Sequence, residues 1–192
     1  MPSDPQVQLP NIAQVQFGSL ENATTEFRIC PALCIEINGP VRFSASGEFI
    51  DGPDDVRLFP DVETKLWEYR NQGFLILGIT NEGGVAFGFK SPSRYEAETR
   101  ATVNAFARNP FHIIKACFNM EAGTVEPWKH RSLLRMPDYG MLAILEMEAF
   151  AGGYIIDWNE SLLIGDRPED ATCANNAGIG YRSAIQFFGR TD

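Results

Sequence analysis

The stretch that decides the fold is Leu33-Cys34-Ile35-Glu36-Ile37-Asn38-Gly39-Pro40. The apolar run that ends at Ile35 has the length of a buried strand, and Gly39-Pro40 cannot continue a β-ladder. Glu36 and Asn38 therefore stand where this predicted strand ends. In an open α/β sheet, ligands bind outside the carboxyl ends of the strands, so both residues are candidates for a site. They can equally cap the strand and begin a turn, as Asn-Gly does well.

The composition is that of a globular protein without a basic surface. Of the 192 residues, 44% are hydrophobic and 21% charged, and one domain with a core of good size is expected. The formal net charge of −9 argues against nucleic acid as the main partner, because phosphate neutralisation needs a basic face. The apolar runs are too short to span a bilayer, and the N-terminus carries no secretory signal pattern. We expect no nucleic acid, no membrane and a cytoplasmic location.

The four cysteines, Cys30, Cys34, Cys117 and Cys173, have no metal-ligand spacing. On one strand, Cys30 and Cys34 would lie ~13 Å apart, which is beyond disulfide reach. A reduced protein is therefore expected. Residues 1–25 are rich in proline and side-chain amides and predict an irregular arm, either a tail or an interaction arm, with a short edge strand near 13–17. Residues 26–192 are expected to form a single domain.

Beyond residue 40, predicted strands and helices alternate. Helices are expected at 60–73, from a capping box at Ser93 and Glu96 to about Arg108, from near Pro137 to 152, and at 169–176. Strands are expected at 27–37, 74–79, 111–116, 161–164 and 179–181. This alternation predicts an α/β fold with a doubly wound, mainly parallel sheet. Residues 41–50 predict a small β-hairpin flap after the first core strand, and residues 117–134 an irregular insertion.

Polar side chains follow three of the predicted strands. They are the pairs Glu36/Asn38, Thr80/Asn81 and Asp166/Asp170. Because parallel strands end at one edge of a sheet, these residues are expected to converge. Carboxylates brought together suit Mg²⁺, whereas a hydroxyl and an amide suit a phosphate oxygen. Asp166 also has a plain structural interpretation, as the residue that caps the next helix.

Four separated motifs resemble the haloacid dehalogenase (HAD) superfamily, and within it the small phosphatases that act on histidinol phosphate and heptose bisphosphate. They are residues 36–39 with 49–52 after the flap, residues 73–86, residues 137–142, and residues 163–178. The resemblance covers the chain from about residue 28 to 181. It implies a HAD-like Rossmannoid fold.

In that family the first motif supplies an aspartate nucleophile and an aspartate general acid/base. A threonine and a lysine hold the phosphate, and later aspartates hold Mg²⁺. By position, the resemblance implies Glu36 as the nucleophile, Asn38 as the acid/base residue, Thr80 and Asn81 as phosphate-binding residues, and Glu36, Asp166 and Asp170 as Mg²⁺ ligands.

This chain departs from that pattern where the chemistry is carried. Glu36 is one methylene longer than aspartate, and a displacement of ~1 Å from in-line attack can cost about 10²-fold. Asn38 has no titratable proton, which removes acid–base help typically worth ~10²–10⁴-fold. Pro40 stands where threonine is usual. Met136 stands where the lysine is expected.

The insertion also departs from the subfamily. Its zinc loop would need several cysteines and histidines, and only Cys117 and His130 remain, so no zinc site is expected. Lys129, Arg131 or Arg135 would have to replace the charge of the missing lysine.

Three functions follow as hypotheses. The first is a phosphatase-fold protein without phosphatase activity that acts in binding, regulation or scaffolding, with the 1–25 arm or the 117–135 insertion as its protein-binding surface. The second is a Mg²⁺-dependent phosphomonoesterase that uses Glu36 as its nucleophile. The third is a metal-dependent sensor that binds a small phosphorylated ligand without cleaving it.

Overall fold

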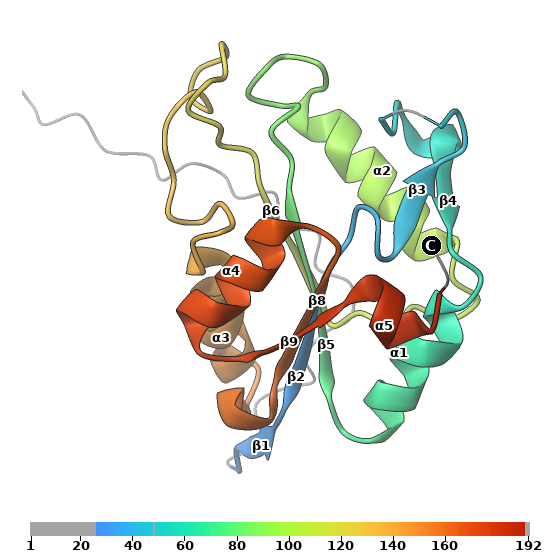
Figure 1. Cartoon of the computed structure of the whole chain (residues 1–192), viewed down its shortest axis with the longest axis vertical. Helices are drawn as coiled ribbons and strands as arrows, with labels where there is room; N and C mark the ends of the chain where they lie inside the picture. The colour runs from blue at the N-terminus through green and yellow to red at the C-terminus, as the bar shows by residue number, and fades with distance from the viewer. Residues whose placement is uncertain (1–25, 48, 191–192) are drawn as a thin grey trace, which may run out of the picture.

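The computed structural model describes residues 26–47 and 49–190, so the predicted arm at 1–25 lies outside the described residues. A central sheet of parallel strands runs in the order β6-β5-β2-β8-β9 (Figure 1). These strands are β2 Ala32–Glu36, β5 Leu75–Asn81, β6 Ile113–Cys117, β8 Leu162–Gly165 and β9 Gly180–Ser183. The prediction of a doubly wound parallel α/β sheet is confirmed.

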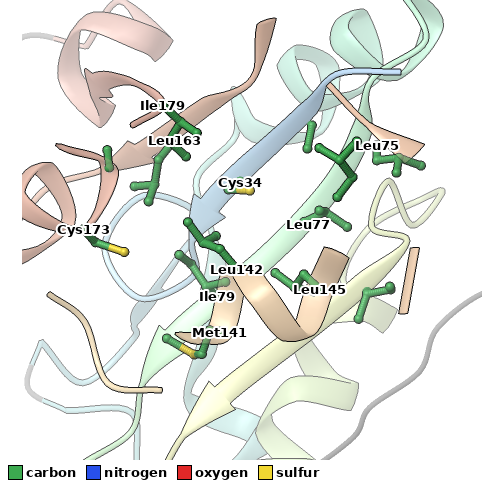
Figure 2. Packing of buried hydrophobic residues seen from close by; sticks show 14 of the residues in the cluster. Cys34, Leu75, Leu77, Ile79, Met141, Leu142, Leu145, Leu163, Cys173 and Ile179 are labelled. Carbon is green, nitrogen blue, oxygen red and sulfur yellow. The ribbon is translucent and has the colours of Figure 1, made fainter. Parts of the chain in front are cut away.

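Helices cover both faces of the sheet (Figure 1). They are α1 Val62–Asn71, α2 Pro92–Asn104, α3 Gly140–Ala151, α4 Pro168–Ala177 and α5 Ala184–Phe188. Because side chains alternate along a strand, β2 serves two cores. Cys34 packs in a cluster with residues of α3 and α4, and Ile35 packs in another with residues of α1, α2 and α5. Figure 2 shows Cys34 in the first cluster, with Leu77 of β5 and Leu145 of α3.

The two central strands are buried along their whole length. Every residue of β2 and of β5 is buried, as expected for parallel strands covered on both faces. Polar side chains at the carboxyl ends of these strands therefore lie in the protein interior. Glu36 and Thr80 are both 0% exposed, and this burial decides their chemistry.

Two small sheets were not fully predicted. The predicted strand 27–37 is divided by Pro31 into β1 Arg28–Cys30 and β2, because proline has no backbone N–H to donate to a ladder. The strand β1 pairs in parallel with β7 Tyr154–Ile156. A short 3-10 helix, Trp158–Glu160, links β7 to β8.

The flap forms, but with a different second strand. β3 Arg42–Ser44 pairs antiparallel with β4 Val56–Leu58, beyond a 3-10 turn at Pro53–Asp55. The prediction that the second strand resumes at 49–50 is wrong. The Asp55 carboxylate accepts hydrogen bonds from the Ser44 hydroxyl and from the backbone and hydroxyl of Ser46. These bonds hold a longer loop closed between the strands. The flap lies beside α2 (Figure 1).

The start of α2 also differs from the prediction. The N-cap is Ser91, whose hydroxyl accepts a hydrogen bond from the backbone of Arg94 at 3.1 Å, and Pro92 is the first helical residue. The predicted capping box from Ser93 to Glu96 is therefore wrong by two residues. Proline suits the first turn because its missing N–H has no intrahelical acceptor there.

Candidate active site

The ends of three neighbouring strands form the site. β5, β2 and β8 are adjacent in the sheet, with Glu36 opposite Ile79 and Ile35 opposite Ile164. Because all three strands are parallel, their carboxyl ends lie at one edge. Glu36, Thr80 and Asp166 stand at or just after these ends, so the topology brings together the three predicted strand ends.

Glu36 is a buried carboxyl that is hydrogen-bonded to Thr80. Its Oε1 accepts a hydrogen bond from the Thr80 hydroxyl at 2.8 Å. Its Oε2 is buried and has no hydrogen-bond partner in the described part of the chain. Burial raises the pKa of Glu36 well above its ordinary value, and the nearby Asp170 carboxyl raises it further, although the Thr80 hydrogen bond lowers it. The neutral acid, which is a poor nucleophile, is therefore favoured at this position.

Asn38 is held on both sides of its amide. Its Nδ2 donates to the Thr80 hydroxyl at 2.9 Å and to Glu82 Oε1 at 2.7 Å. Its Oδ1 accepts from Arg42 Nε at 2.8 Å. The amide orientation is thus fixed by an acceptor carboxylate on one side and a donor guanidinium on the other.

Arg42 extends this arrangement into the interior. It is 1% exposed, and it donates to Asn38, to the Thr102 hydroxyl of α2 at 2.9 Å and to Glu82 Oε1 at 3.2 Å. A buried guanidinium needs such partners, because an unpaired buried charge is costly. Arg42 therefore joins the end of β2, the loop after β5 and helix α2.

Two more charges complete what we call the Asn38 network, defined as Asn38, Arg42, Glu82, Lys90 and Glu98. Lys90 Nζ lies 3.6 Å from Glu82 Oε2 and 2.7 Å from Glu98 Oε2. Glu98, on α2, is 0% exposed and also accepts from the backbone of Gly52 at 3.2 Å. The network thereby ties the flap to the strand ends.

Asn81 connects β5 to the segment before α3. Its Nδ2 donates to the Met136 carbonyl at 2.9 Å, and its Oδ1 accepts from the Met136 N–H at 3.1 Å. Met136 is 3% exposed, so both backbone groups would otherwise be buried without these partners. Asn81 therefore uses its amide to bind the backbone at the position where the family resemblance expects a lysine.

Asp166 and Asp170 lie at the start of α4 with different surroundings. Asp170 Oδ2 accepts from the backbone N–H groups of Asp166 and Arg167, both at 3.0 Å, in a capping box, while its buried Oδ1 has no hydrogen-bond partner within the described residues. Burial raises the pKa of Asp170 to about 6. Asp166 is exposed and leans over the first strand end: a Cβ added to Gly39 would meet Asp166 Oδ2 at 1.9 Å.

The carboxyl oxygens at the strand ends have the chemistry of a Mg²⁺ site. Glu36 Oε2 and Asp170 Oδ1 are buried oxygens without partners, as a hard cation would require. Over residues 26–47 and 49–190, however, no three histidine, cysteine, aspartate or glutamate side chains gather closely enough to hold a metal ion. Because Mg²⁺ is commonly held by one or two carboxylates together with water and substrate phosphates, this pair of oxygens suits the ion without a third such side chain.

The insertion brings one of its three candidate cations to the site. Lys129 pairs with Glu126 at 3.0 Å, and Arg131 lies 3.7 Å from Asp138. Arg135 instead lies beside the loop after β5, since its guanidinium would meet a Cβ added to Gly83 at 3.4 Å.

Cys117 and His130, the two residues of the insertion with side chains suited to zinc, do not lie together. Cys117 is buried at the end of β6, whereas His130 is exposed and contacts Glu126 at 2.8 Å. The four cysteines, all in the described part, are free thiols.

No sequence pattern predicted a role for four charged residues of this site, Arg42, Glu82, Lys90 and Glu98. Glu82 directly follows Thr80-Asn81, and Arg42 lies two residues after Pro40 in the flap. The available signal was a charged residue close to a motif.

In the residues that the structure describes, no helix is both long and apolar enough to cross a membrane.

No protein-family model matches the chain. Among curated proteins, it is 28% identical over 159 residues to D-glycero-beta-D-manno-heptose-1,7-bisphosphate 7-phosphatase of Escherichia coli K12, covering 81% of this chain and 79% of the relative. The protein of the same name from Rhodopseudomonas palustris is 24% identical over 155 residues, covering 79% and 82%.

Solved structures show the same fold. A HAD-like phosphatase from Mesorhizobium loti has a TM-score of 0.65 at 22% identity, covering 80% of this chain and 71% of that one. The D,D-heptose 1,7-bisphosphate phosphatase from B. bronchiseptica, solved with magnesium and phosphate, has a TM-score of 0.60 at 18% identity, covering 79% and 78%. The chain therefore has the fold of HAD-like phosphatases and is similar in sequence to curated heptose-bisphosphate 7-phosphatases.

Proposed function

We propose that this protein is a HAD-like phosphatase-fold protein that binds rather than hydrolyses, and that it acts in binding, regulation or scaffolding. The observation that carries the proposal is the state of Asn38. It occupies the position that the family resemblance gives to the general acid/base, and its amide is hydrogen-bonded to Thr80, Glu82 and Arg42. It has no proton to give to a leaving group.

The nucleophile position supports the same proposal. Attack on phosphorus needs an ionised carboxylate that can reach the substrate. Glu36 is 0% exposed, and burial raises its pKa so that the neutral form is favoured. The burial of the carboxyl at position 36 and the lack of a proton donor at position 38 act on the same reaction.

The proposal is tested by an assay of the purified protein with Mg²⁺ against a panel of phosphomonoesters that includes heptose 1,7-bisphosphate. We expect no release of phosphate above the level of Glu36→Ala and Asp166→Ala. Release that both substitutions abolish would contradict the proposal. The Escherichia coli relative, assayed in parallel, provides the positive control.

A second candidate is a slow Mg²⁺-dependent phosphomonoesterase with Glu36 as its nucleophile. The unpartnered oxygens of Glu36 and Asp170 favour it, and Arg135 next to Gly83 would supply a cation for the phosphate. This candidate requires Mg²⁺ to be held by these carboxyls together with water and the substrate phosphate. Mg²⁺-dependent thermal stabilisation by a phosphate analogue without turnover would instead indicate a sensor of a phosphorylated ligand.

The insertion is the proposed protein-binding surface within the described residues. It is anchored by backbone hydrogen bonds from Thr124 and Val125 to the Ala86 carbonyl, at 2.8 and 2.9 Å. It exposes Leu133, at 67%, and Val125, at 37%. The arm at 1–25 is the second proposed surface. A pull-down that compares the full chain with Leu133→Asp and with a variant lacking residues 1–25 tests both, and equal partner recovery from all three would remove both surfaces.

A further inference from the structure

The Asn38 network restricts which residue position 38 can hold. Asn38 Nδ2 donates to Glu82 Oε1 at 2.7 Å, and Oδ1 accepts from Arg42 Nε at 2.8 Å. An aspartate has nearly the same shape and would still accept from Arg42. It has no donor for Glu82, so it would hold two carboxylate oxygens at hydrogen-bond distance from each other.

The charges of the network lead to the same restriction. Arg42 and Lys90 are paired with Glu82 and Glu98, which makes two positive and two negative groups. All four side chains are at most 11% exposed. A third carboxylate at the partly buried position 38 would have no cation of its own, because both cations are already paired.

We propose that Glu82 is the positioning residue that requires a neutral amide at position 38. Residues 38 and 82 then form one unit of a carboxylate and an amide, and these two groups can be exchanged between the positions. In this chain the carboxylate of the unit stands at 82 and the amide at 38. The opposite arrangement, made by Asn38→Asp together with Glu82→Gln, has the same size and the same net charge. This inference rests on the proposed function, because position 38 is treated as the acid/base position of a phosphatase fold.

The exchange preserves most of the contacts. A glutamine at position 82 would donate its Nε2 proton to the carboxylate that Asn38→Asp introduces, which reverses the direction of the hydrogen bond and keeps its length. Arg42 Nε would then face a carboxylate oxygen instead of an amide oxygen, and the bond would become charge-assisted. The exchange would lose the 3.2 Å contact of Arg42 with Glu82 and the 3.6 Å approach of Lys90 to Glu82.

The test compares thermal unfolding of the full chain with four variants: Asn38→Asp, Glu82→Gln, Asn38→Asp with Glu82→Gln, and Asn38→Asp with Glu98→Gln. We expect Asn38→Asp to lower Tm by on the order of 5–10 °C, because it places a third carboxylate beside Glu82 where only Arg42 and Lys90 balance the charge. The variant that also carries Glu82→Gln should recover at least half of that loss.

The Glu98→Gln combination is the matched control. Glu98 belongs to the same network, pairs with Lys90 and is equally buried, but Asn38 does not hydrogen-bond to it. The Glu98→Gln substitution removes the same charge as Glu82→Gln, and we expect it to recover none of the lost Tm. If Asn38→Asp alone fails to fold, soluble folded protein from the Glu82→Gln combination and not from the Glu98→Gln combination gives the same answer.

Two results would overturn the inference. One is an Asn38→Asp protein as stable as the parent. The other is equal recovery from both double variants, which would mean that only the total charge matters. These outcomes are independent of turnover: release of phosphate by the parent would overturn the proposed function and leave the coupling of 38 and 82 to be judged by Tm alone.

Discussion

The two halves of the candidate site differ in how completely their polar groups are paired. On the flap side, Asn38 and Arg42 are joined to Glu82 by hydrogen bonds of 2.7 to 3.2 Å. On the α4 side, Glu36 Oε2 and Asp170 Oδ1 are buried without hydrogen-bond partners in the described part of the chain. The first half is a closed structural network, and the second is a group of acids held in the interior.

This difference separates the roles of the two halves. Groups that are fully paired and buried stabilise the fold and cannot take part in proton transfer without breaking their partners' bonds. Buried carboxyls without partners respond instead by a raised pKa. Asn38 is thus part of the framework, whereas the carboxyl half has oxygens that bind nothing in the described residues.

The largest effect is expected from breaking the closed half. Arg42→Met would leave Glu82 buried beside Asn38 without its guanidinium partner, and removing one partner of a buried pair costs about 3–5 kcal/mol. Urea unfolding measures the loss. Arg94→Met, which removes the exposed ion pair with Asp51, is the control and should cost less than about 1 kcal/mol. Similar losses for both variants would contradict the closed network.

A smaller effect is expected where the two halves meet. Gly39 has φ of +100°, and an added Cβ would meet Asp166 Oδ2 at 1.9 Å. Gly39→Ala should cost about 1–3 kcal/mol from the backbone conformation alone, and more from the collision. Gly47→Ala controls for the backbone, because Gly47 has φ of +86° and nothing within 4 Å of its added Cβ. Equal costs in urea unfolding would mean that the exposed Asp166 side chain moves aside and does not hold its position against Gly39.

The α4 side, with its unpartnered buried carboxyls, should make the stability of the protein depend on pH. The pKa of Asp170 is 3.8 in the unfolded chain, and burial raises it to about 6 in the folded protein. Between these values the folded protein holds a proton that the unfolded chain has released. The stability contributed by the neutral acid is therefore fully present below the unfolded pKa of 3.8 and is lost as the pH rises through about 6.

The comparison of the parent with Asp170→Asn isolates this dependence. The two proteins should be about equally stable near pH ~4, and the variant should be relatively more stable at pH ~7.5. The stability of the parent must be compared with that of the variant because other groups also change stability with pH. Glu36 and Asp166, whose pKa values are raised, lower stability as the pH rises, as Asp170 does. His112, whose pKa burial lowers to about 4, has the opposite effect. A constant difference across this range would contradict an isolated acid at Asp170.

The fold could be predicted because its signals are local. The apolar runs at 32–35 and 75–79 are buried throughout, and a strand covered on both faces needs such a run. The predictions of strand position were wrong where contacts between residues distant in sequence determine the structure. The flap closes at Val56 rather than at Phe49 because Asp55 holds the intervening loop.

The site could be predicted only in part. The ends of parallel strands must share an edge, so Glu36, Thr80 and Asp166 were brought to one place by topology alone. The partners of Asn38 could not be predicted, because Arg42 and Glu82 reach it through side-chain directions that no spacing rule contains. The use of Asn81 to bind the backbone of Met136, 55 residues away, is of the same kind.

The central claim is that this site does not transfer phosphate. It is tested most directly in a single turnover, with the protein in excess over heptose 1,7-bisphosphate labelled with ³²P on the 7-phosphate, with Mg²⁺, and with an acid quench. We predict neither protein-bound label nor free phosphate above the level of Glu36→Ala. Protein-bound label that appears in the parent and is absent from Glu36→Ala would contradict the account, because it would identify Glu36 as a working nucleophile.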